Sequence, residues 1–452
     1  MAKHRRKNYS KQRRKSHSRK SNKYIYALSV SLVALAVVGY GVYYIIQNKE
    51  QIFSGSSNSN NNQNQSLTGY GYVRSPYGAK FKIVDSNKSF VMASSHFDSP
   101  GASTSANSLN EVETKSSISN QGSQEVKEAS NTVSVLDEFK TYFSSENIIF
   151  FADTNIRKGN QDKAFSTLSN SSYSMLFKDN DTYSTSLSST VNTFANSYDK
   201  LIYSFNSNDL SISNGTYDDI KSVIKPNYES KTGFAINTYL TLPSTNFTDG
   251  QGWVDYSDKY YSSNSDAVYN YVKYLISDHI PVGTDISYKN NSSSDSTIRV
   301  GGWNTLNFNL YNKEIPSDFD VSNPTSTNTE TKRIVHEINV AKIISKAKYD
   351  LIGLIEINKN TTQESVNYFL NYLNSVDTNN NSYKALLSEN TPAIKQDSGQ
   401  IEQVIYLYNS KKIELDNSIS PKFYNSYSAS TLNAFDIFIN SLNINYLNNK
   451  EI

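Results

Sequence analysis

The first clear periodic pattern in the chain lies between residues 126 and 155. Apolar side chains recur there at steps of three and four residues, which predicts an amphipathic helix. The members of this stripe are Val126, Ala129, Val133, Leu136, Phe139 and Phe143. The apolar run 147–152 has the length of a buried strand, and Asp153 and Asn155 come directly after it. This region therefore predicts a helix and then a strand that ends in polar groups.

A second region predicts the order strand, helix, strand. Residues 298–303 and 349–355 are apolar runs of strand length, and a helix is predicted between them from about Thr329. Its apolar stripe consists of Ile334, Ile338, Ala341 and Ile344. Asn304 follows the first strand and Glu356 the second. Polar groups at several strand ends can converge in an active site, although a single Asn or Asp in such a place is more often a turn residue.

The N-terminal region differs sharply from the rest in charge. Residues 1–23 hold eleven Lys or Arg and no acidic residue, and residues 24–46 hold no charge. An uncharged segment of this length can span a bilayer, and a basic flank favours the cytoplasmic side. The pattern predicts a cytoplasmic tail (1–23), a transmembrane anchor (24–46) and a low-complexity stalk (47–69), with the remainder outside the cell. A cleaved signal peptide is the alternative.

Composition narrows the functions open to the external part. Without the eleven positive charges of the tail, the formal net charge changes from +2 to −9. This negative charge does not favour general electrostatic attraction to a phosphate backbone, so any contact with nucleic acid must be local and assisted by a metal ion. The chain contains no cysteine, so it forms no disulfide.

Two of the five histidines have surroundings typical of a catalytic site. His96 and His279 each follow a short apolar stretch and have an aspartate close in sequence, at Asp98 and Asp278. A lone histidine is more often a surface or structural residue, but here the same surroundings occur twice. The other three are assigned to the surface: His4 and His17 in the basic tail, and His336 on the charged side of its helix.

Several short motifs around these residues resemble one enzyme family. Asp153-Thr154-Asn155, Ser277-Asp278-His279 and the run 351–356 are similar to motifs of the endonuclease/exonuclease/phosphatase superfamily, which includes pancreatic deoxyribonuclease. The likeness is strongest to membrane nucleases of wall-less bacteria. Two positions depart from the usual motifs, where Ala152 replaces a glycine and Ile355 a glutamine.

The resemblance extends over about residues 70–415, but the order of its motifs is rotated. Other matching segments contain Arg74, His96, Asp199, Asn304 and Glu402. The half that usually comes second precedes the half that usually comes first, joined here through the polar segment 288–297, which is expected to be flexible. Close chain ends permit such a circular permutation without a change of core. Residues 416–452 match nothing in the family and have no assigned role.

The resemblance implies a role for each polar residue. His279 would be the general base, oriented by Asp199, since a neutral imidazole accepts a proton near neutral pH. His96 would form a second pair with Glu402, and Asp153 with Asn155 would position water and phosphate. Arg74 would bind a phosphate oxygen together with Asn155. The implied ligands of a divalent metal are Glu356, Asn304 and Asp278.

The expected fold is a four-layer α/β sandwich, in which two packed mixed sheets lie between helices, circularly permuted and with an N-terminal transmembrane helix. The expected function is that of a membrane-anchored, extracellular, metal-dependent nuclease that hydrolyses DNA, with RNA as a further substrate. Mg²⁺ is the expected ion, and Ca²⁺ or Mn²⁺ are alternatives. The expected partners are nucleic acid and the membrane, with no protein partner.

Two other functions remain open at this point. A phosphodiesterase or phosphatase that acts on lipid headgroups or inositol phosphates would share the fold. A surface protein that binds nucleic acid without cutting it would share the motifs but not use them for catalysis.

Overall fold

A computed structural model describes residues 72–102, 113–179, 184–190, 194–212, 272–319, 329–391 and 401–424. Within these ranges no helix combines the length and the apolar character needed to cross a bilayer. This finding corrects the predicted fold class and the predicted cell-membrane location, both of which relied on a transmembrane helix. The segments 1–23, 24–46 and 47–69, assigned to tail, anchor and stalk, lie outside the described residues.

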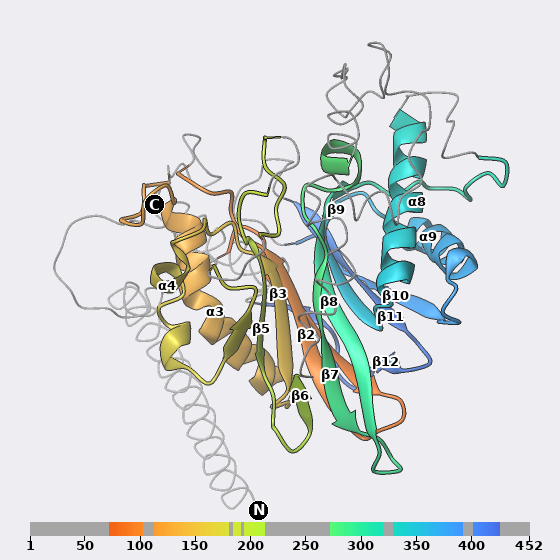
Figure 1. Ribbon diagram of the computed structural model, residues 1–452, viewed down its shortest axis with the longest axis horizontal. Helices are drawn as coiled ribbons and strands as arrows, with labels where there is room; N and C mark the ends of the chain where they lie inside the picture. The colour runs from red at the N-terminus through yellow and green to blue at the C-terminus, as the bar shows by residue number, and fades with distance from the viewer. Residues whose placement is uncertain are drawn as a thin grey trace, which may run out of the picture. The chain divides into compact units, whose positions relative to one another are not determined.

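The described part is an α/β structure with two mixed sheets (Figure 1). In the first sheet the strand order is β12-β1-β2-β3-β5-β4, and β13 also pairs with β1. The strands β2 and β3 are parallel, and the other neighbours are antiparallel. The bounds are β1 (Tyr77–Ile83), β2 (Ser89–His96), β3 (Ile148–Asp153), β4 (Ser174–Leu176), β5 (Asp199–Ser204), β12 (Ile413–Leu415) and β13 (Lys422–Phe423).

The second sheet has the order β10-β11-β9-β8-β7-β6. Only β8 and β9 are parallel among the neighbouring strands of this described sheet. The bounds are β6 (Leu210–Ile212), β7 (Val282–Lys289), β8 (Asp295–Phe308), β9 (Leu351–Asn358), β10 (Tyr383–Leu387) and β11 (Glu402–Asn409).

Helices cover the outer face of each sheet, and the inner faces pack on each other (Figure 1). The first sheet carries α3 (Ser123–Tyr142), α4 (Gln161–Ala164) and η1 (Leu168–Asn170). The second carries α8 (Thr329–Ala347), α9 (Gln363–Val376) and η2 (Val272–Ile276). In β3, Phe150 packs under α3 whereas Phe151 packs between the sheets, because side chains alternate along a strand. Both faces of β3 are therefore buried, which explains its continuous apolar run.

The helices and strands expected from the apolar pattern are present at nearly the predicted residues. The predicted helix of residues 126–143 is α3, and its strand 147–152 is β3 at Ile148–Asp153. The second helix begins at Thr329, as expected. The segment 288–297 is not a flexible link, because β7 and β8 continue into it and form a hairpin. The side chain of Asn290 accepts hydrogen bonds from the backbone of Ser292 and Ser294 and so closes the turn.

The last described residues pack against the first ones. Strand β13 pairs with β1, and the backbone N–H of Tyr424 donates to the carbonyl of Pro76 at 2.7 Å. The ring of Tyr424 lies 5.9 Å from that of Tyr72, edge to face. Residues 416–424 therefore belong to the same packed unit as the two sheets, and the two described ends of the chain meet.

Candidate active site

Strand pairing in the first sheet brings three of the predicted site residues into one row. His96 is the last residue of β2, Asp153 the last of β3, and Asp199 the first of β5. His96 is the register partner of Asp153, and Asp153 is the partner of Asp199. Parallel strands end at the same edge of a sheet, so this arrangement follows directly from the topology.

The second sheet places four further residues opposite this row. Asn304 lies in β8 beside β9, which carries Glu356, and Glu402 begins the neighbouring β11. His279 lies just before β7, where its backbone carbonyl accepts a hydrogen bond from the indole N–H of Trp303 at 2.9 Å. Strands β8, β9 and β11 thus hold Asn304, Glu356 and Glu402, and the segment before β7 holds His279, at the same edge as the first row.

Each histidine is paired with a carboxylate from the other half of the chain. His279 Nδ1 lies 2.7 Å from Asp199 Oδ2, and His96 Nδ1 lies 3.1 Å from Glu402 Oε1. The second ring nitrogen of each histidine faces a common atom, because His279 Nε2 and His96 Nε2 lie 3.4 and 3.7 Å from Asp153 Oδ2. Both imidazoles therefore face the same carboxylate oxygen.

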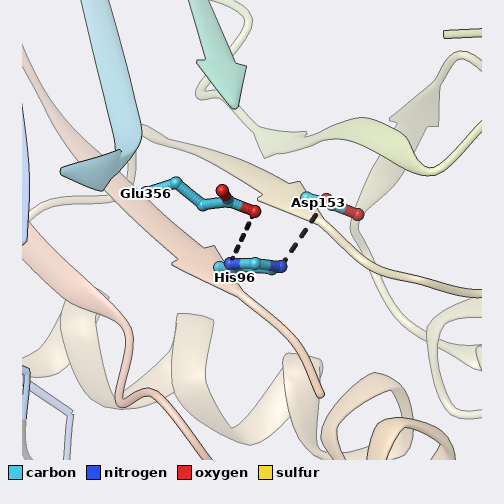
Figure 2. Close-up of side chains that lie close together, drawn as sticks. All are labelled: His96, Asp153 and Glu356. Atoms are coloured by element: carbon cyan, nitrogen blue, oxygen red, sulfur yellow. Dashed lines mark ion pairs between the residues drawn. The ribbon is translucent and has the colours of Figure 1, made fainter. Parts of the chain in front are cut away.

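Asn304 joins this centre to Glu356. Its side-chain amide nitrogen donates to Asp153 Oδ2 and to Glu356 Oε1, both at 2.9 Å. Figure 2 shows His96 between Asp153 and Glu356, with its Nδ1 at 3.5 Å from Glu356 Oε1. Two imidazoles, one amide and four carboxylates thus form one connected cluster of mostly buried groups.

Two overlapping sets within the cluster could hold a metal ion. One consists of His96, Asp153 and Glu356, and the other of Asp153, Asp199 and His279, with ligand atoms within 4.8 Å of one another in each set. Glu356 was predicted as a ligand and lies in the first set. Asn304 points an amide N–H, not its oxygen, at the carboxylates, since its oxygen accepts from the backbone of Leu306. The half-buried Asp278 belongs to neither set, although its charge raises the pKa of Glu356.

Arg74 and Asn155 form the wall of the site next to His96. The guanidinium of Arg74 is 3% exposed, donates to the carbonyls of His96 and Phe97, and lies 3.4 Å from Glu402 Oε1. The Asn155 amide donates to the Phe97 carbonyl at 3.2 Å. An open cavity of about 520 Å³ lies beside Arg74 and is lined by Arg74, His96, Glu356 and Glu402.

Two site residues have strained backbones. Asn155 and Glu356 adopt φ values of 52° and 59°, in the left-handed region that non-glycine residues seldom occupy. Such conformations cost on the order of 1 kcal/mol or more and are found where the surroundings enforce them, commonly at functional sites. Asn155 lies two residues after the end of β3 and Glu356 lies within β9 next to Asn304, so both left-handed residues are at the site, which supports a functional role.

The charges around His279 keep a proton on its pair with Asp199. Burial alone lowers the pKa of the His279 imidazole, but Asp199 and Asp153 outweigh this and hold that pKa well above its ordinary value. Burial, aided by Asp153, raises the pKa of Asp199 in spite of the opposing charge of His279. The pair therefore retains a proton near neutral pH.

The carboxylates on the other side of the site differ from each other. Burial raises the pKa of Glu402, but Arg74 and His96 reverse this and lower it overall. Burial and Arg74 lower the pKa of His96, whereas Glu402 and Glu356 raise it above its ordinary value. Burial raises the pKa of Glu356, with Glu402 adding to the effect. A nearby cation would therefore stabilise the charged form of Glu356, which burial disfavours, more than that of Glu402, which is already stabilised by Arg74 and His96.

The sequence predicted that His336 lies on the charged side of its helix, and this prediction was wrong. It is 1% exposed, its ring lies 4.7 Å from that of Phe308, and burial lowers its pKa to about 4. It hydrogen-bonds to the backbone at Ile276 and Thr305, beside the two segments that carry His279 and Asn304. The basic neighbours of His336 in the sequence gave the wrong signal.

Some residues of the site were not found from the sequence. The backbone N–H of Asn307 donates to Glu356 Oε2 at 2.9 Å, and Lys359 lines the cavity. Lys359 follows Glu356 by three residues, so its place after the strand was a usable signal. The contact of Asn307 depends on a bulge in β8 after Asn304, which no local sequence pattern revealed.

Comparisons with known proteins assign no family to the chain. No protein-family profile matches it. An uncharacterized protein of Mycoplasma pneumoniae is 40% identical over 131 residues, which are 29% of this chain and 26% of that protein. The chain thus spans about a quarter of this relative.

Proposed function

We propose that this protein is a metal-dependent phosphodiesterase that hydrolyses nucleic acid, with DNA as its substrate. The observation that carries the proposal is the convergence of His96 and His279 on Asp153. The Nδ1 atom of each imidazole lies at hydrogen-bond distance from a second carboxylate, that of Glu402 or Asp199. The motif resemblance to the endonuclease/exonuclease/phosphatase superfamily supports the same reaction. Hydrolysis of a phosphodiester requires an activated water, neutralisation of the phosphoryl charge and a proton for the leaving oxygen.

His279 is assigned as the general base that takes a proton from the attacking water. Asp199 fixes the tautomer of the ring through Nδ1 and stabilises the imidazolium after proton transfer. Because the pKa of His279 is raised, only a fraction of the resting protein carries the neutral base near pH 7. Activity is therefore expected to increase with pH until the raised pKa is passed.

His96 is assigned to the opposite side of the phosphate. The raised pKa of His96 and the carboxylate of Glu402 beside its Nδ1 favour the protonated form of this imidazole. It then donates a hydrogen bond to a phosphoryl oxygen or the leaving oxygen. Arg74 holds the His96 backbone carbonyl and the Glu402 carboxylate at the same time, so it fixes this pair and adds positive charge to the cavity.

A divalent cation would be held by the carboxylates of Glu356 and Asp153. The donor set fits such an ion, because Glu356 is a partly buried carboxyl with a raised pKa that accepts hydrogen bonds from the Asn304 amide and from the backbone N–H of Asn307. When bound, the ion neutralises charge on the phosphoryl oxygens. The predominance of carboxylate oxygens favours Mg²⁺, with Mn²⁺ or Ca²⁺ as alternatives.

Purified full-length protein with Mg²⁺, Mn²⁺ or Ca²⁺ should cleave plasmid, linear and single-stranded DNA. The cleavage should be abolished by EDTA and by His279→Ala. RNA, sphingomyelin and an inositol phosphate should be tested in the same series, since hydrolysis of a lipid or inositol phosphate without effect on DNA would replace the proposed substrate.

Intact DNA with every metal would refute the nuclease function. Binding of DNA that survives a His96→Ala, His279→Ala double substitution and EDTA would instead identify a binding protein.

A further inference from the structure

A buried carboxylate outside the cluster touches two segments of the site. Glu128 lies in α3 and has no exposed surface. Its Oε1 accepts a hydrogen bond from the backbone N–H of Val73, and its Oε2 accepts one from the backbone N–H of Asp98 at 2.7 Å. Val73 immediately precedes Arg74, and Asp98 follows His96 by two residues.

The same two segments are linked to each other at the site. Arg74 donates to the carbonyls of His96 and Phe97, and Ser95 Oγ donates to the carbonyl of Arg74 at 3.1 Å. These bonds fix how the segments lie relative to each other. The bonds from Glu128 fix where both lie relative to α3, because each carboxylate oxygen holds one of them.

The location of this carboxylate is energetically costly. Its neighbours on the inner face of α3 include Ala129 and Leu136, which are fully buried, and burial together with the charge of Asp98 raises the pKa of Glu128 to about 8. An apolar residue would avoid this cost but would remove the acceptor of two buried backbone N–H groups and of the Gln124 side-chain amide. The need for two acceptor oxygens, one for the segment of Val73 and one for the segment of Asp98, therefore explains why a carboxylate occupies this position.

We propose that Glu128 is a positioning residue for the phosphodiesterase site: it holds the segments of Arg74 and His96 at the spacing needed to bind one phosphoryl group. This inference rests on the proposed function. Glu128 does not touch the substrate, and it acts through the backbone of Val73 and Asp98. A displacement of about 1 Å at such a site is enough to reduce catalysis on the order of 100-fold.

The test is Glu128→Gln, which keeps the shape of the side chain but replaces one acceptor oxygen by an NH₂ group that cannot accept. The matched control is Glu337→Gln. Glu337 is a carboxylate in α8 that is 1% exposed, has a pKa raised by burial, and accepts a backbone N–H, that of Tyr311, at 3.1 Å. The two substitutions make the same chemical change in two helices, and only one of them touches the site segments.

Hydrolysis of bis(p-nitrophenyl) phosphate and thermal unfolding should be measured for all three proteins with Mg²⁺ at about pH 9, above the raised pKa of Glu128, so that both oxygens of its carboxylate can accept hydrogen bonds. We expect kcat/KM to fall at least 10-fold in Glu128→Gln and less than 2-fold in Glu337→Gln, at comparable melting temperatures. Equal kcat/KM values for the two variants would overturn the positioning role.

Inorganic phosphate binding, measured by calorimetry with Mg²⁺, separates failure of this inference from failure of the proposed function. If the unaltered protein hydrolyses no phosphodiester, the proposed function fails, and phosphate affinity alone decides the role of Glu128. At least 5-fold weaker binding in Glu128→Gln, but not in Glu337→Gln, supports the positioning role. Equal affinities in all three proteins, or no phosphate binding by any of them, refute it.

Discussion

At the scale of single residues, Asp153 determines how the charges of the site are distributed. One of its oxygens faces His96, His279 and the amide of Asn304. Burial raises the pKa of Asp153, but the two imidazoles outweigh burial and lower it. Asp153 therefore remains an anion where burial alone would neutralise it, and its charge in turn raises the pKa of His279.

Asp199→Asn tests the assignment of the general base. The substitution removes the carboxylate that raises the pKa of His279, so the neutral imidazole should be present at lower pH. We expect kcat to fall roughly 10²- to 10⁴-fold, because an Asn partner also favours the wrong tautomer. The acidic limb of the pH–rate profile should move to lower pH by about one unit or more.

The profile should be recorded for the unaltered protein and the variant between pH 5 and about 9, a range around the ordinary histidine pKa of about 6.5. An acidic limb that stays in place in Asp199→Asn would show that another group is the base. If the variant is too inactive for its acidic limb to be measured, the pKa of the His279 ring can be compared in the two proteins by NMR titration.

At the scale of secondary structure elements, close contact between β3 and β8 brings the two sheets together at the site. An added Cβ on Gly302 would lie 2.0 Å from the ring of Phe151. Gly302 precedes Asn304 by two residues, and Phe151 precedes Asp153 by two residues. The Phe151 ring packs on Gly302, and two residues further along each strand Asn304 donates its hydrogen bond to Asp153.

Gly302→Ala should weaken both the fold and the site. The added methyl group must displace the Phe151 ring, which we expect to cost about 1–3 kcal/mol of unfolding free energy and to lengthen the contact between Asn304 and Asp153. Gly78→Ala is a suitable control, because its Cβ would approach the ring of Phe139 only to 3.0 Å, on the face of β1 toward α3. Urea unfolding and kcat should both change more for Gly302→Ala, and equal effects would contradict the argument.

The elements near the site could be predicted from the sequence better than the contacts between them. The apolar runs before Asp153 and Glu356 marked two buried strands, and a polar residue after such a strand is a local signal. The orientation of the Asn304 amide and the burial of His336 are tertiary effects. The basic residues beside His336 in sequence indicated a surface position, whereas packing against Phe308 decided the outcome.

Glu128 illustrates the same limit. In the sequence it is one of several polar residues within an amphipathic pattern, and nothing local distinguishes it from a solvated glutamate. Its role depends on Val73 and Asp98, which are 55 and 30 residues away. Only the three-dimensional arrangement shows that the carboxylate meets two backbone donors.

At the scale of the whole described unit, the two chain halves build the site together. Residues 72–212 supply His96 and Asp199, and residues 272–424 supply their partners Glu402 and His279. The hairpin between β7 and β8 joins strands of the second sheet, and β13 beside β1 brings Tyr424 close to Tyr72. If the chain were opened in the hairpin between β7 and β8, and Tyr424 were joined to Tyr72, its motifs would follow the order of the family that they resemble.

A rearranged chain tests this relation directly. It would start at Ser292, run to Tyr424, continue through about six Gly and Ser residues into Tyr72, and end at Asn291. A linker of this length spans up to about 20 Å, which is ample for ends whose rings lie 5.9 Å apart. We expect the rearranged protein to fold with the circular dichroism spectrum of the parent and to retain its hydrolytic activity within about 10-fold.

An insoluble product, or a folded one whose activity is lost, would show that the order of the two halves is itself required. A second chain opened between Gly301 and Gly302, inside β8, provides the control and should not fold.

Because each histidine has its carboxylate partner in the other half, the order of synthesis on the ribosome governs when the site is complete. Arg74, His96, Asp153 and Asp199 are translated first, whereas Glu402 is among the last residues of the described unit to be made. The nascent polypeptide therefore has no paired His96 until β11 has emerged and docked. The proposed phosphodiesterase would in this way stay inactive until its synthesis is nearly complete.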